Sequence, residues 1–169
     1  MAALQAMRGI DLIAAVVLVA EIGDMSRFAS APELMAWLGL VPSENSTGEE
    51  VRRGPITKAG NGRARRVLVE AAWSYRHPLR VGSAMQARVE AAPRPAREIA
   101  WKAQRRLTAR YRRLAASDKQ QTVIVTAIAR KMAGFIWDIC RQTMPTATAA
   151  RACGPLALDG ARPAHRPSA

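Results

Sequence analysis

The sequence predicts an all-α fold, and three observations lead to this expectation. Ala, Leu, Val and Arg dominate the 169 residues, whereas aromatic residues make up only 5%, and Ala, Leu and Arg are good helix formers. The apolar share of 49% is enough to bury a core. Near the C-terminus, apolar residues recur at the 3.6-residue helical period. We expect one small helical domain over residues 1–142 and a separate tail over residues 143–169.

The N-terminal segment predicts two helices joined by a glycine turn. Met1–Met7 resembles the end of a helix, and Gly9 stops it before a second helix that runs from about Asp11 to Ile22. Such a helix-hairpin-helix-like start can hold a DNA backbone through amides near the turn, or can be a hairpin that only packs. Pro32, in the first turn after Ser30 or Ala31, then predicts a third helix.

A Gly-rich loop of catalytic type is expected next. Ser43, Ser46 and Thr47 precede Gly48 in a segment that also holds the turn residue Pro42, so these hydroxyls are expected on a loop. An exposed hydroxyl is the first requirement of a nucleophile, although turn chemistry alone also explains the pattern.

Basic residues follow the hydroxyls and suit a phosphate. Arg52, Arg53 and Lys58 are able to neutralise a phosphodiester and the charge that develops when an alkoxide attacks phosphorus. Asn61 is the expected N-cap of a helix over Asn61–Arg76. Cations are unfavourable at a helix N-terminus, so their crowding there indicates an external anion, which we take to be nucleic-acid phosphate. The cations in these first turns are Arg63, Arg65 and Arg66.

The rest of the chain predicts a long pair of helices. Leu79–Pro95 is expected to be a loop with one short helix, followed by a basic helix over Ala96–Ala115. In that helix Trp101, Leu107, Tyr111 and Leu114 form the expected apolar stripe, while arginines including Arg105 and Arg106 face outward, either to nucleic acid or only to solvent. Asp118 is the expected cap of a buried helix over Lys119–Gln142. Met144–Ala169, rich in Pro, Ala, Gly and Arg, is expected to be disordered.

Charge is concentrated in the middle of the chain. Of the formal net charge of +13, the segment Glu49–Arg113 carries 17 basic and 5 acidic residues, a balance of +12. Such a field indicates a polyanionic partner, and nucleic acid is the commonest. The apolar run Leu12–Ala20 is too short to span a bilayer, so no membrane partner is expected. Cys140 and Cys153 predict free thiols and no metal site. We expect a cytoplasmic, nucleoid-associated protein.

Several motifs together resemble the C-terminal serine domain of the Piv-type DEDD transposases, the insertion-sequence family one-ten. They are AEIGD, SRFAS, LMAWLGLVPSE, NSTG, RRGPITKAGN and ARRVLVEAAW, in that order. The resemblance covers roughly Leu4 to Cys140 and is densest from Glu21 to Tyr75. It implies a transposition enzyme in which a serine attacks a DNA phosphodiester.

The resemblance also implies residues and partners. The serine lies just before the glycine that corresponds to Gly48, which points to Ser46, with Thr47 as the rival position. The family carries an N-terminal RuvC-like domain with acidic metal ligands, which this sequence lacks, so Mg²⁺ is expected only with that domain and no cofactor in this chain. DNA, a structured guide RNA, and a homo-oligomer or the full-length transposase are the implied partners.

Three hypotheses stay open. The chain is either an enzyme fragment or a catalytically inactive, truncated nucleic-acid-binding remnant, because it lacks the acidic domain. A basic RNA-binding protein unrelated to transposition is the third hypothesis.

Overall fold

The computed structural model describes residues 1–47 and 50–143, and the side chains of residues 45–53 lie outside the description. The predicted disorder of Met144–Ala169 and the predicted free thiol of Cys153 fall outside the described residues.

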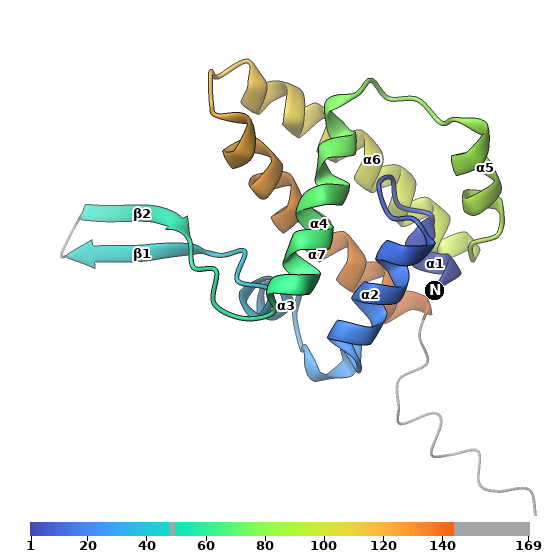
Figure 1. The fold of residues 1–169 in the computed structure, drawn as a ribbon, viewed down its shortest axis with the longest axis horizontal. Coiled ribbons are helices and arrows are strands. Elements are labelled where there is room, and N and C mark those ends of the chain that lie inside the picture. The colour runs from blue at the N-terminus through green and yellow to red at the C-terminus, as the bar shows by residue number, and fades with distance from the viewer. Residues whose placement is uncertain (48–49, 144–169) are drawn as a thin grey trace, which may run out of the picture.

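Helices dominate the described chain, which confirms the predicted all-α class. A two-stranded antiparallel sheet projects to one side of the helical body (Figure 1). The elements are, in order, α1 (Ala2–Gln5), α2 (Leu12–Ile22), η1 (Met25–Arg27), α3 (Ala31–Trp37), β1 (Pro42–Thr47), β2 (Glu50–Ile56), α4 (Gly62–Ala72), η2 (Trp73–Arg76), α5 (Ser83–Glu90), α6 (Arg94–Ala115) and α7 (Gln121–Thr143).

Helix α7 lies at the centre of the body, as its apolar period predicts. It contacts α6, α4, α3 and α1. Its buried stripe recurs every three to four residues, which is the spacing of one helix face: Ile124, Val125, Ile128, Ala129, Met132, Ala133, Ile136, Ile139 and Cys140. Small residues in this stripe let neighbours approach closely, and the Met35 side chain of α3 lies directly over Gly134.

Helices α6 and α7 form the predicted pair of long helices, with two differences from expectation. Trp101 was predicted in the apolar stripe of α6, but 48% of it is exposed. The buried stripe of α6 instead contains Ala100, Ala103, Leu107 and Tyr111, because their spacing places them on one face while Trp101 lies about 100° around the helix from Ala100. Asp118 adopts a left-handed conformation in the connecting turn, and α7 begins three residues later at Gln121.

The segment predicted as a loop around Ser46 is a β-hairpin, so that prediction was wrong. Strand β1 pairs with β2 in antiparallel register, with an irregularity between Pro42 and Glu44. Neither strand alternates polar and apolar residues, because the hairpin stands away from the core, and so the sequence lacked the usual strand signal. Prolines are tolerated in these strands since a two-stranded sheet has only edges.

The true loop, Thr57–Asn61, is fastened to the end of α3. The Lys58 amide donates to the Gly39 carbonyl (3.2 Å) and the Asn61 amide to the Trp37 carbonyl (3.1 Å). Gly60 has φ +105°, and a Cβ there would lie 2.0 Å from the Trp37 oxygen. The α3 backbone therefore fills the space beside this glycine.

The N-terminal turn also packs inward. Gly9, at φ +84°, leaves no room for a Cβ against the Ala71 carbonyl of α4. The amides of Met7 and Ile10 bond within the turn, to Leu4 and Met7 carbonyls. The helix-hairpin-helix-like start is therefore present, and its turn serves packing against α4.

Replacing Gly60 with Ala should destabilise the fold by at least about 2 kcal/mol, because both the left-handed backbone and the contact with Trp37 exclude a Cβ. Gly62→Ala is the matched control. Gly62 lies in the first turn of α4 with only the Arg65 guanidinium near it, at 3.5 Å, so this change should be neutral or slightly stabilising. Urea denaturation of both variants gives the comparison, and equal stability of the two would contradict the fastening role of Gly60.

Candidate nucleic-acid interface

The hairpin places the predicted nucleophile and the predicted loop cations near one another along the ladder. Ser46 pairs with Val51 and Thr47 with Glu50, while Arg52 lies opposite Asn45 and Arg53 opposite Glu44. The backbone of Arg52 is thus one rung from that of Ser46. The side chains of these residues belong to the part that is not described.

Ser43, the third hydroxyl of the predicted cluster, has a structural role. Its Oγ donates to the Pro55 carbonyl across the ladder at 3.0 Å. Gly54 lies beneath it, where a Cβ would come within 2.5 Å of the Ser43 Oγ. This bond occupies Ser43 at the irregular base of the hairpin.

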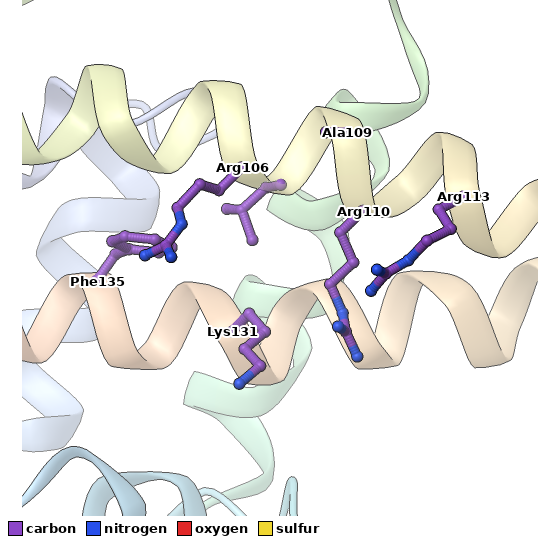
Figure 2. A pocket seen from close by; sticks show the side chains of 7 residues that line it. Arg106, Ala109, Arg110, Arg113, Lys131 and Phe135 are labelled. Carbon is purple, nitrogen blue, oxygen red and sulfur yellow. The ribbon is translucent and has the colours of Figure 1, made fainter.

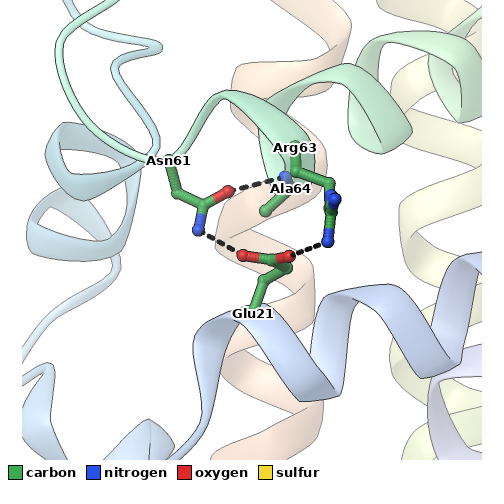
Figure 3. Close-up of polar contacts among 4 residues, drawn as sticks. All are labelled: Glu21, Asn61, Arg63 and Ala64. Carbon is green, nitrogen blue, oxygen red and sulfur yellow. Dashed lines mark hydrogen bonds and ion pairs between the residues drawn. The ribbon is translucent and has the colours of Figure 1, made fainter.

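A carboxylate of the chain itself lies at the N-terminus of α4. The Asn61 Oδ1 accepts from the Ala64 amide (2.8 Å), which confirms the predicted N-cap, and the Asn61 Nδ2 donates to Glu21 of α2 at 2.7 Å (Figure 3). Arg63 donates to the other Glu21 oxygen at 3.1 Å. The hydrogen bond from Asn61 lowers the pKa of Glu21 below its ordinary value, burial opposes this, and Arg63 reinforces it.

The other cations of α4 also have partners within the protein. Arg65 is half-buried and donates to the Leu38 carbonyl at 2.8 Å. Arg66 pairs with Glu70 one turn later at 3.3 Å, with both side chains largely exposed. The anion that we expected at this helix end is therefore supplied, for Asn61 and Arg63, by Glu21.

A second set of cations lines a groove between α6 and α7. One cavity of about 560 Å³ is bounded by Arg106, Arg110 and Arg113 from α6 and by Lys131 and Phe135 from α7 (Figure 2). A second cavity of about 620 Å³ lies between α7 and the base of the hairpin, with Lys58 and Arg130 in its wall. Arg110 and Lys131 line both cavities. We call the whole the basic groove, with six cations: Lys58, Arg106, Arg110, Arg113, Arg130 and Lys131.

The groove cations are not neutralised by the described part of the protein. The ion pairs among described residues are Arg63–Glu21, Arg66–Glu70 and Arg94–Glu98, and none involves the groove. The Nε atom of Arg110 is buried without a hydrogen-bond partner. A buried donor without an acceptor is costly.

The structure thus divides the predicted nucleic-acid-binding residues into three groups. Lys58 and Arg106 lie in the basic groove. Asn61, Arg63, Arg65 and Arg66 lie at the start of α4, and Arg52 and Arg53 lie in the hairpin. Arg105 is exposed, about 100° around α6 from Arg106, and lines neither cavity.

Sequence reasoning missed Arg130 and Lys131 of the groove, whereas Arg110 and Arg113 belong to the basic helix whose arginines were expected to face nucleic acid or solvent. For α6 a signal existed, because positions 106, 110 and 113 follow the spacing of one helix face. Arg130 and Lys131 stand alone in an apolar helix, and only the position of the hairpin reveals what they face.

Other chemistries find no support in the described residues. Residues 1–47 and 50–143 bring together no group of three or more His, Cys, Asp or Glu that could hold a metal ion. Burial raises the pKa of the Cys140 thiol to about 11, which makes it unreactive at neutral pH. Among the described helices, none is both long and apolar enough to cross a membrane.

Comparison with known proteins identifies the family. A sequence model of the IS116/IS110/IS902 transposase family matches residues 1–89, which is more than half of the chain. The chain belongs to this transposase family.

Relatives named as transposases agree with the assignment. The chain is 56% identical over 144 residues to transposase y4qE of Sinorhizobium fredii, which covers 85% of this chain and 37% of that protein. It is 41% identical over 69 residues to a family 20 transposase of Pseudomonas aeruginosa, covering 41% of this chain and 20% of that protein. The chain therefore matches 37% of the length of the first relative and 20% of the length of the second.

Stability should depend on pH through Glu21. Because its pKa is lowered in the folded protein, the ionised carboxylate stabilises the fold above its ordinary pKa of 4.5, and this contribution is lost as pH falls through the folded value. Urea midpoints should therefore show Glu21→Gln less stable than the parent at pH 7, with the difference shrinking below about pH 4.5.

Glu70→Gln is the control for this measurement. Glu70 pairs with Arg66 on the surface, where both side chains are mostly exposed, so its removal should change stability little at any pH. A pH-independent difference between Glu21→Gln and the parent would show that the Glu21 charge is not the cause.

Proposed function

We propose that this chain supplies the serine nucleophile and a nucleic-acid surface to a transposase of the IS110 type. The observation that carries the proposal is the place of Ser46, near the end of a hairpin that projects from the helical body and whose base borders the basic groove. A hydroxyl on such a projection can reach a phosphodiester whose strand is held against the body.

The proposed step is a transesterification at phosphorus. The Ser46 hydroxyl loses its proton and forms a bond to phosphorus, while the bond from phosphorus to one deoxyribose oxygen breaks and that oxygen takes up a proton. The phosphoserine bond conserves the energy of the phosphodiester, so a DNA hydroxyl can reverse the step without ATP. Arg52 and Arg53 would stabilise the extra negative charge on the phosphorane-like state. Lys58, at the base of the hairpin, would instead bind the strand in the groove.

Further parts of the machinery belong to the longer proteins. In this proposal, acidic metal ligands for Mg²⁺ come from a separate RuvC-like domain. A structured guide RNA, a homo-oligomer or full-length transposase as partner, and a cytoplasmic, nucleoid-associated location are parts of the same proposal.

A binding-only function is the second candidate. The basic groove is formed independently of Ser46, so a chain without nucleophilic activity would still bind nucleic acid and compete with an intact transposase. An RNA-binding protein unrelated to transposition has less support, because three curated relatives are transposases by name.

Covalent adduct formation separates enzyme from binder. The chain should be mixed with the acidic domain of a relative, supplied in trans, and with labelled element-end DNA, and the adducts resolved on denaturing gels. Ser46→Ala should abolish the adduct if Ser46 is the nucleophile, and Thr47→Ala should do so if Thr47 is. Ser43→Ala is the matched control, because Ser43 is bonded to Pro55 and its loss should leave adducts intact. Tight binding without any adduct would leave the binding-only function.

The hairpin cations give a separate prediction. Arg52→Ala with Arg53→Ala should weaken DNA binding, and the slope of log affinity against log salt should fall by about 1.8 if each contacts one duplex phosphate. Fluorescence anisotropy at 50 to 200 mM salt measures this slope. An unaltered slope would remove the hairpin cations from the DNA contact surface.

A further inference from the structure

We propose that the basic groove between α6 and α7 holds the phosphodiester backbone of one nucleic-acid strand and directs it toward the hairpin, with Arg110 as the central ligand. The inference rests on the proposed function only in taking nucleic acid as the partner. It adds a binding site that does not include the serine.

The spacing of the α6 arginines suits a strand of phosphates. Arg106, Arg110 and Arg113 follow one face of α6 and reach toward α7 (Figure 2). Seven residues of helix span about 10.5 Å, and duplex DNA carries one phosphate per strand every 3.4 Å or so of its axis. The three arginines thus match a run of roughly three phosphates.

Arg110 lies where the two cavities of the groove meet. Its side chain is half-buried and lines both cavities, and its Nε lacks an acceptor. A guanidinium binds phosphate through two parallel hydrogen bonds, so a side chain that lines both cavities suits a phosphate held in the groove. The neighbouring cations have no described carboxylate to pair with, so the attraction is free for a ligand.

The cations are not required to hold the two helices together. Leu107 of α6 and Ile128 of α7 are each buried to 1% exposure or less, and such apolar contacts supply the packing energy of the helix pair. Arg106, Arg113 and Lys131 are exposed. These three cations lie on one side of the α6–α7 helix pair, where they repel one another unless an anion is bound between them.

The groove continues from the helix pair to the base of the hairpin. Arg110 and Lys131 belong to the cavity lined by Arg106 and Phe135, and also to the cavity lined by Pro42, Gly54 and Pro55. A strand that follows these cations leads from Phe135 to the strands that carry Ser46. The half-buried Phe135 ring at the far end offers a face on which a base can stack.

A matched pair of double variants tests the proposal. Arg106→Gln with Arg113→Gln removes two exposed groove cations, and Arg105→Gln with Arg112→Gln removes two exposed cations that line neither cavity. In each double variant the two changed residues lie on α6, seven positions apart. Both variants change the net charge equally, so they differ only in the face of the helix that they alter.

Binding should be measured by fluorescence anisotropy for a single-stranded DNA, the same sequence as duplex and as single-stranded RNA, from 50 to 200 mM salt. The groove variant should lower the salt slope by about 1.4 for single strands or 1.8 for duplex, a loss of roughly 25- to 60-fold in affinity at 100 mM salt. For the control variant, the decrease in the logarithm of the affinity should be less than about a third of the decrease in the groove variant. The ligand form with the groove-specific loss identifies the occupant, and equal losses for both variants on every ligand would overturn the proposal.

Arg110→Gln adds a test of the central ligand. It should weaken binding without lowering the melting temperature, because it removes a buried donor that has no partner. A lowered melting temperature with unchanged affinity would make Arg110 a structural residue. If the variant does not fold, Lys131→Gln, at an exposed position that lines both cavities, should show the same loss of affinity, and its failure to do so would count against the site.

The groove proposal and the nucleophile proposal can be contradicted independently of each other. Ser46→Ala should keep the parent salt slope while losing the covalent adduct. If the groove variant forms the adduct and binds with unchanged affinity, the groove proposal is wrong and the nucleophile proposal stands. If affinity falls only in the groove variant and no protein forms an adduct, the nucleophile proposal is wrong and the groove proposal stands.

Discussion

Burial of the apolar stripe of α7 is the interaction on which the rest of the structure depends. One continuous face of this helix contacts α6, α4, α3 and α1, so each of those elements takes its position from it. Ala129, Ala133 and Gly134 keep part of that face flat, and this lets α3 come close. The positions beside the stripe remain open, and they hold Arg130 and Lys131. The same packing that makes the core thus presents two cations next to α6.

The second constraint is the fastening of the hairpin to the helical body. Left-handed glycines at positions 39 and 60 allow the end of α3 and the start of α4 to meet backbone to backbone. Arg65 adds a bond to the Leu38 carbonyl and Asn61 a bond to Glu21. These contacts fix both ends of the hairpin on the body while the strands extend beyond it (Figure 1). A reactive group carried near the end of such a projection is positioned by a rigid base and still faces outward.

Electrostatics explains why two cationic regions of the same chain differ. At the start of α4, Glu21 neutralises Arg63 and Glu70 pairs with Arg66. In the basic groove no described acid plays that part, and a buried guanidinium nitrogen stays unpaired. Local pairing thus separates cations that have a carboxylate partner within the protein from cations that are free for an external anion. Net charge alone, +12 over Glu49–Arg113, cannot make that distinction.

The sequence by itself determined the helical class, the buried C-terminal helix, the N-cap at Asn61 and the glycine turn at Gly9, because caps and periodicity act between residues close in the chain. Its motifs also indicated the transposase family to which the match of the family sequence model assigns the chain. The β-hairpin was missed since its strands lack an apolar alternation, and Trp101 was misplaced since only packing against α7 decides which face of α6 is buried. Tertiary structure alone decided that Glu21 meets Asn61 across 40 residues and that Arg110, Lys131 and Lys58 line one groove. Such contacts join distant segments, and their geometry depends on how whole helices pack, which no local pattern records.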